Sequence, residues 1–134
     1  MADPFNLRRF VEAQAGGVYE QALAELRAGQ KRSHWIWFIF PQHEALGRSA
    51  TARFFGLSGT DEARAYADHP ILGERYREAA AAILPHLGDR SADAILGPID
   101  ALKLRSSMEI FSESRPEEPL FAALLEALDK QNRN

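Results

Sequence analysis

The sequence predicts an all-α protein, a single compact multihelical domain of about six to eight helices. Apolar residues recur at helical spacing along most of the chain, and no pair of neighbouring runs combines β-alternation with a tight turn. The length of 134 residues suits one hydrophobic core. We therefore treat residues 1–134 as one domain, in which the polar tail 130–134 is expected to be frayed.

The composition is that of an ordinary globular protein, with 46% hydrophobic and 26% charged residues. Cysteine is absent, which excludes disulfides, thiolate metal sites and a cysteine nucleophile. A net charge of −3 argues against an extended nucleic-acid surface. The sequence shows no secretory signal and no apolar run near the roughly 20 residues of a membrane span, so we expect no membrane association and a cytoplasmic location.

Two helices are expected before residue 30. Asp3 followed by Pro4 is typical of a helix start, and Gly16-Gly17 should end that helix. The second helix should cover about residues 18–28 and end at Gly29. Its predicted buried stripe is Tyr19, Leu23 and Leu26, whereas Glu20, Glu25 and Arg27 are expected to lie away from it.

The most unusual segment is residues 31–42, which contains both tryptophans and two of the eight phenylalanines. Ser33 can cap a short helix, while the run from Trp35 to Phe40 has the composition of a strand. We favour a buried helical turn, because a lone strand would need a partner and no second β-like run supplies one.

The later elements follow from caps and breakers. A loop-rich region is expected from His43 to Gly59. The predicted helices are about 60–69 with Thr60 as its cap, 72–87 with an end or kink at Pro85, 91–96 capped by Ser91, 99–111, and a last one from Pro119.

The predicted helix 99–111 carries a polar stripe on the side expected to be buried. On a helical wheel, Arg105 and Glu109 mark the solvent side, and Asp100, Lys103 and Ser107 align on the opposite one. Buried charges must be paired or contact a ligand. Two interpretations stay open: an Asp100–Lys103 ion pair with Ser107 bonded to backbone, or the lining of a ligand pocket.

Several motifs together resemble a known family. They are Phe10-Val11-Glu12-Ala13-Gln14, residues 22–26, residues 29–42, Leu46-Gly47-Arg48-Ser49, His69-Pro70-Ile71-Leu72-Gly73 and residues 100–108. The chain is similar to the bacterial domain of unknown function 1810, whose members are sometimes mislabelled calpastatin. One local departure is Glu109, where the family pattern prefers threonine. The resemblance implies no established activity, and the pattern is faintly similar to that of small helical proteins acting on ADP-ribose-type metabolites.

Metal binding and serine catalysis are not predicted. The four histidines, His34, His43, His69 and His86, form neither a His-x-x-x-His nor a Glu-x-x-His spacing. Ser107 lies mid-helix with no strand before it, unlike a nucleophile on a tight turn. We therefore expect no metal and no cofactor, and we leave open whether the protein is an enzyme.

Anion recognition is better supported by the residue types. Lys31, Arg32 and Ser33 are expected to begin a helical turn, where free backbone N–H groups and positive charge attract anions. Trp35 and Trp37 either stack a base or pack in the core. Three further candidates can each donate and accept hydrogen bonds: Gln14, His34 and Gln42.

These observations lead to two functional hypotheses. The first is a pocket for a small anionic, nucleotide- or ADP-ribose-like ligand, in which Asp100, Lys103 and Ser107 meet His34 and the turn at residues 31–32. The alternative is a protein-interaction module whose aromatic stretch 34–42 is partly exposed, since tryptophan and arginine are enriched at interfaces. A concave polar site would favour the first hypothesis, and a convex apolar patch the second.

Overall fold

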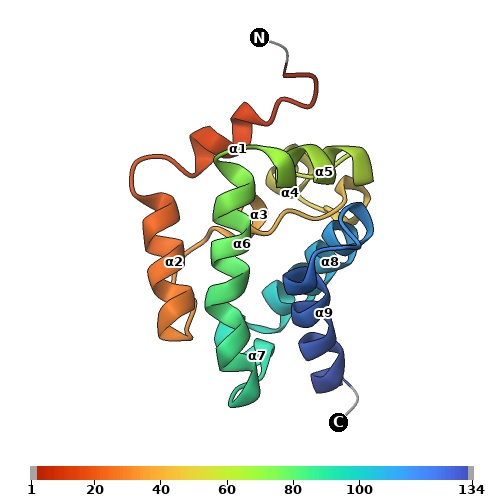
Figure 1. Cartoon of the computed structure of the whole chain (residues 1–134). Helices are drawn as coiled ribbons and strands as arrows, with labels where there is room; N and C mark the ends of the chain where they lie inside the picture. Colours follow the sequence, from red (N-terminus) through yellow and green to blue (C-terminus); the bar gives the residue numbers. More distant parts are fainter. Residues whose placement is uncertain (1–2, 133–134) are drawn as a thin grey trace.

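A computed structural model describes residues 3–132 as a set of helices joined by short loops (Figure 1). The elements are α1 (Arg8–Ala13), α2 (Val18–Ala28), α3 (Ile36–Ile39), η1 (Glu44–Leu46), α4 (Ala50–Phe54), α5 (Thr60–Asp68), α6 (Leu72–Ile83), η2 (Leu84–Gly88), α7 (Ala92–Leu96), α8 (Pro98–Ser114) and α9 (Pro119–Asn132), where η denotes a 3₁₀ helix. Within these residues the only β-type pairing is an isolated bridge between His43 and Leu57. The all-α prediction is confirmed.

The described chain contains nine α-helices, where the sequence predicted about six to eight. Three of the nine, α3, α4 and α7, are short, with four or five residues each. The helical interpretation of the segment 31–42 is confirmed by α3. Pro85 acts as predicted, since α6 stops just before it and passes into η2. Gly29 ends α2 with a left-handed φ of 74°, a conformation that glycine adopts without steric cost.

The start of the first helix was predicted wrongly. α1 begins at Arg8 and not at Asp3. The Asp3 carboxylate accepts hydrogen bonds from the backbone N–H groups of Leu7 at 2.8 Å and Arg8 at 3.1 Å. Asp3 thus caps the helix from several residues ahead, across a turn in which Asn6 has a φ of 54°.

α6 lies at the centre of the fold, with α2 on one side and α8 and α9 on the other (Figure 1). Aromatic rings surround Tyr76, which lies on α6. Its ring stacks on Phe111 with centroids 3.9 Å apart and meets Phe40, Tyr66 and Phe121 edge to face. This cluster joins the C-terminal end of α3, together with α5, α8 and α9, to the central helix, so the same core supports α8, which forms one wall of the site described below.

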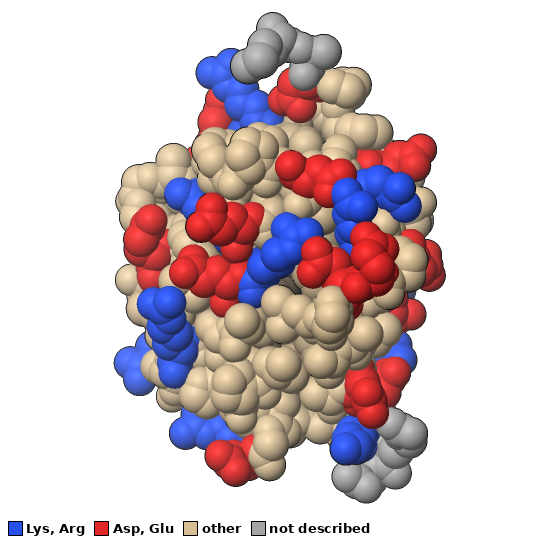
Figure 2. Space-filling view, viewed as in Figure 1, with Lys and Arg blue, Asp and Glu red and all other residues tan. Residues whose placement is uncertain are grey.

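Acidic and basic side chains are interspersed on the face shown in Figure 2. Some ion pairs join separate parts of the chain, as Arg77 does with Glu118 and Arg115 with Asp68. Among residues 3–132, none of the helices combines the length and apolar composition that a membrane crossing requires.

Candidate functional site

A buried carboxylate, Glu25, organises the turn that precedes α3. Its side chain was expected to lie away from the core, but the residue is only 5% exposed. Oε1 accepts the backbone N–H groups of Arg32 and Ser33 at 2.7 and 3.0 Å. The Trp35 indole N–H donates to Oε1 at 2.9 Å, and the Ser33 hydroxyl and the Gln21 amide donate to Oε2 at 2.6 and 2.8 Å. Glu25 therefore fixes residues 32–35 on α2.

The charge of Glu25 depends on these donors. Burial acts to raise the pKa of this carboxyl, but the hydrogen bonds from Ser33, Arg32, Gln21 and Trp35 outweigh burial and lower the pKa from 4.5 to about 2. The carboxylate is therefore ionised at neutral pH. Because it already occupies the backbone N–H groups of residues 32 and 33, those groups are not free to bind an external anion, contrary to the prediction from sequence.

Lys31 is held inside the protein by three contacts. Its ammonium lies 2.8 Å from Oδ2 of Asp100 and 5.1 Å from the centroid of the Trp35 ring, and its side chain is 8% exposed. Its backbone N–H donates to the carbonyl of Ile95 at 2.8 Å. The partner of Asp100 at hydrogen-bond distance is thus Lys31 on another segment of the chain.

Lys103 is the second cation near Asp100. Its ammonium lies 3.8 Å from Oδ1 of Asp100 and 5.1 Å from the centroid of the Trp37 ring, while its side chain is 23% exposed. The Asp100–Lys103 pair that the wheel suggested is therefore present, but it is the longer of two pairs made by one carboxylate. Lys103 keeps donors available on the side facing solvent.

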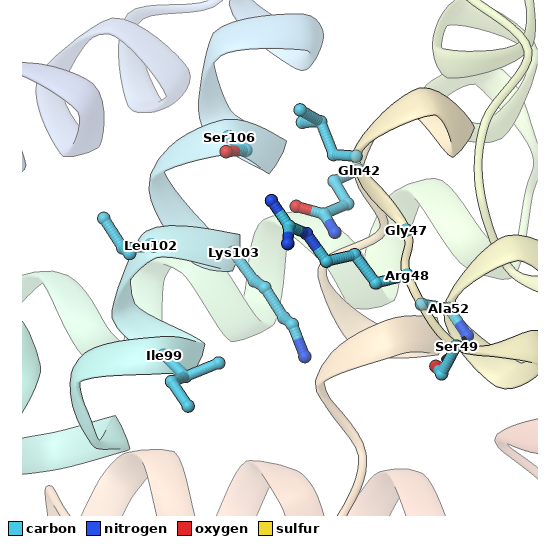
Figure 3. A pocket seen from close by; sticks show the side chains of 10 residues that line it. Gln42, Gly47, Arg48, Ser49, Ala52, Ile99, Leu102, Lys103 and Ser106 are labelled. Carbon is cyan, nitrogen blue, oxygen red and sulfur yellow. Dashed lines mark hydrogen bonds between the residues drawn. The ribbon is translucent and has the colours of Figure 1, made fainter.

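A pocket of about 430 Å³ opens beside Lys103, between α8 and the segment 42–52 (Figure 3). The lining residues are Gln42, Leu46, Gly47, Arg48, Ser49, Ala52, Ile99, Leu102, Lys103 and Ser106. They include two cations, Arg48 and Lys103, which extend from opposite walls into the space between them, and no carboxylate. Three apolar lining residues are strongly exposed: Leu46 at 53%, Ile99 at 69% and Leu102 at 67%.

The structure brings only part of the predicted constellation together. Gln42 and Lys103 line the pocket, and Lys31 and Asp100 lie directly behind Lys103. His34 and Arg32 are exposed and are not among the lining residues. The expected convergence of His34 and the turn at residues 31–32 on the pocket of Lys103 is therefore wrong; Lys31 does not line the pocket either and instead contacts Asp100.

Two predicted residues belong to the core. Ser107 is fully buried, as the wheel indicated, and its hydroxyl lies 2.8 Å from the hydroxyl of Tyr76. The buried Gln14 amide donates to the carbonyl of Phe38 at 2.7 Å and to the hydroxyl of Tyr66 at 3.1 Å. These contacts satisfy both side chains within the protein, away from the pocket lining.

The aromatic pair has divided roles. Trp35 is buried in the core, whereas Trp37 is half-buried and lies beneath the Lys103 ammonium. Of the two roles considered for the tryptophans, packing in the core holds for Trp35. Among residues 3–132, no group of three or more histidines or carboxylates is arranged to hold a metal ion.

Sequence reasoning missed Arg48 on the opposite wall and two apolar lining residues on the wall of Lys103. Arg48 lies in the motif 46–49, which was used for the family resemblance and was not assigned to a site. Ile99 and Leu102 are exposed apolar residues three apart on α8, a pattern that the search for buried stripes does not select. The available signal for a binding site was an arginine next to Gly47 in a predicted loop, because binding residues often lie in loops.

Comparison with known proteins assigns the chain to a family. A family model described as protein of unknown function (DUF1810) matches residues 4–133. The chain belongs to this family. This DUF1810 chain is also similar to a solved structure, the crystal structure of the conserved hypothetical protein Rv1873 from Mycobacterium tuberculosis. The two sequences are 45% identical, and the structures match with a TM-score of 0.90 over 96% of this chain and 90% of that one. No curated protein matches the chain.

Proposed function

We propose that this DUF1810 protein binds a small anionic, nucleotide- or ADP-ribose-like ligand in the pocket between α8 and the segment 42–52. The observation that carries the proposal is the placement of Arg48 and Lys103 on opposite walls of a pocket that has no lining carboxylate. Two like charges facing one space repel each other, and an anion between them removes that repulsion.

The lining supports a ligand with distinct polar and apolar parts. The planar guanidinium of Arg48 suits bidentate contact with a phosphate, and the ammonium of Lys103 supplies a compact positive charge. The amide of Gln42 and the hydroxyl of Ser106 can orient polar groups. The exposed apolar side chains of Ile99 and Leu102 offer a surface for a sugar or base ring.

The proposal is limited to binding. A general base in such a pocket would have to be a carboxylate, a histidine or another group of suitable pKa within reach of the reacting atom. The ten lining residues contain hydroxyls, from Ser49 and Ser106, but neither a carboxylate nor a histidine. The lining therefore supports recognition of an anion and supplies no acid–base pair.

A peptide-binding surface is the second candidate. Leu46, Ile99 and Leu102 are exposed together around the pocket, beside two cations, and this pattern suits an acidic peptide with an apolar anchor. The aromatic stretch itself is a poor anchor patch, because Trp35 and Phe40 are buried.

Lys103→Met separates ligand binding from a purely structural role. We expect AMP, ADP-ribose or ribose 5-phosphate to raise the melting temperature of the wild type, because a ligand at 100 times its Kd stabilises the folded state by about 2.7 kcal/mol. Lys103→Met should lose that shift and remain folded, since Asp100 keeps Lys31 at 2.8 Å. The measurement is a thermal-shift titration followed by calorimetry.

The exposed Lys130 on α9 provides a matched control, and Lys130→Met should keep the wild-type shift. Failure of all three compounds to stabilise the wild type, or an equal shift in Lys103→Met, would contradict the proposal. Binding of an acidic apolar peptide with no response to these phosphates would favour the second candidate.

A further inference from the structure

We propose that Lys31 is a positioning residue for the anion site: it occupies Asp100 and so prevents that carboxylate from neutralising Lys103. The inference rests on the proposed function and adds a residue that does not line the pocket. Lys31 and Asp100 would then act on the ligand only through Lys103, in contrast to the direct ligand contacts expected from sequence.

The geometry places one carboxylate between two cations. Oδ2 of Asp100 lies 2.8 Å from the ammonium of Lys31, and Oδ1 lies 3.8 Å from that of Lys103. The first separation is a charge-assisted hydrogen bond, and the second is beyond hydrogen-bond distance. Asp100 is therefore committed to Lys31, which is the more buried of the two lysines, with 8% of its side chain exposed against 23% for Lys103.

Lys31 is held so that it cannot exchange roles with Lys103. Its backbone is fixed by the hydrogen bond to Ile95, and the two residues after it are fixed by the carboxylate of Glu25. Its ammonium also lies over the ring of Trp35. A buried ammonium without a carboxylate is costly, so Lys31 has no alternative partner as favourable as Asp100.

The charge near the pocket depends on this arrangement. Lys31, Asp100 and Lys103 together carry a net charge of +1, which joins the charge of Arg48 on the opposite wall. Without Lys31, the carboxylate of Asp100 faces Lys103 alone, three residues along the same helix face. The flexible stem of Lys103 can then close the remaining distance and form a neutral pair, which withdraws the ammonium from the pocket.

The test compares three variants with the wild type by calorimetric titration of inorganic pyrophosphate. We expect Lys31→Met to raise the Kd for pyrophosphate about tenfold, because the loss of one partly screened charge interaction has an effect of this size. The double variant Lys31→Met/Asp100→Asn should recover an affinity close to that of the wild type, because it removes the freed carboxylate. Lys130→Met should bind as the wild type does. Circular dichroism establishes that each variant is folded.

A second measurement needs no ligand. The rate at which an amine-reactive ester labels Lys103, followed by mass spectrometry, should fall in Lys31→Met and recover in the double variant, because pairing with Asp100 occupies the ammonium. A structural role for Lys31 alone predicts no recovery in the double variant by either measurement.

The outcomes distinguish this inference from the proposed function. If the wild type binds neither pyrophosphate nor AMP, ADP-ribose or ribose 5-phosphate, and Lys103 labelling is unchanged in Lys31→Met, both the proposed function and this inference are overturned. If the wild type binds pyrophosphate, Lys103→Met does not, and Lys31→Met equals the wild type in both measurements, the anion site stands and the positioning role of Lys31 is wrong.

Discussion

Glu25 shows how one residue can reverse an expectation based on helical periodicity. The wheel placed it away from the stripe formed by Tyr19, Leu23 and Leu26, and those three side chains are indeed buried. Glu25 is buried as well, because the segment after α2 folds back over it and supplies four hydrogen-bond donors, to which Gln21 on α2 adds a fifth. A helical wheel describes the residues of one helix and contains no information about another segment that covers the polar face of that helix.

The first prediction concerns acid stability at Glu25. The folded-state pKa of about 2 lies below the ordinary value of 4.5, so the folded protein binds fewer protons than the unfolded chain between these values. The stabilisation is therefore present above about pH 4.5 and is lost as the pH falls toward 2. We expect Glu25→Ala to cost roughly 1–3 kcal/mol near pH 7, because its donors lose their acceptor, and to lose less stability on acidification than the wild type.

Urea unfolding at about pH 7 and about pH 3 measures both effects. Glu20→Ala, on the same helix but exposed, is the matched control and should keep the acid sensitivity of the wild type. Equal acid-induced losses in the wild type and Glu25→Ala would show that other carboxylates govern the transition.

At the scale of elements, the junction between α5 and α6 explains a motif that the sequence could only match to a family. In the run 69–73, the imidazole of His69 accepts the backbone N–H groups of Ile71 at 3.1 Å and Leu72 at 3.2 Å, and thus caps the start of α6. Gly73 follows, packed against the last turn of α5. This motif therefore has a structural role in joining two helices.

Gly73→Ala should destabilise the protein by about 1–3 kcal/mol, even though alanine favours helix more than glycine does. A Cβ at this position would overlap the carbonyl oxygen of Ala67, which also accepts a hydrogen bond from the guanidinium of Arg77 at 2.8 Å. Backbone atoms at both sides of this contact leave little room to adjust. The measurement is the midpoint of thermal or urea unfolding.

Gly88→Ala is the comparison for this experiment, because a Cβ at Gly88 meets no heavy atom within 4 Å. Its unfolding free energy should stay within about 0.5 kcal/mol of the wild type. A neutral Gly73→Ala would mean that α5 and α6 can separate at this point without cost.

The helix α8 marks the boundary of what periodicity can predict. Its helical wheel placed Ser107 and Lys103 on the inward side, where the structure has them buried and partly buried, and it suggested the Asp100–Lys103 pair, but it could not identify their partners on other segments. Ser107 meets Tyr76 on α6, and Lys103 meets Trp37 in α3, through contacts between segments remote in sequence. The fold class followed from local patterns, while the pocket depends on how α8 approaches the segment 42–52, which no single-element pattern encodes.

At the scale of the whole molecule, the buried apolar side chains form one contiguous cluster. It extends from Leu7 to Leu128 and contains residues of every α-helix of the described chain except α4. The rings around Tyr76 lie within it and connect the C-terminal end of α3 with α5, α8 and α9. No helix that contributes to this cluster can leave without exposing apolar surface on several others, which favours cooperative unfolding.

We therefore predict that the chain unfolds as a single unit, as expected for one domain. Both tryptophans lie in the segment 31–42, so their fluorescence reports on that region, whereas far-UV circular dichroism reports on all helices. The two thermal transitions should coincide in the wild type, and in Glu25→Ala both should move together to lower temperature, because the loss at α2 is shared through the common core. A fluorescence transition that precedes the loss of helicity, in either protein, would show that the aromatic segment unfolds independently of α8 and α9. The anion site would then lie at a boundary between separately unfolding parts, and ligand binding would raise the melting temperature of the fluorescence transition alone.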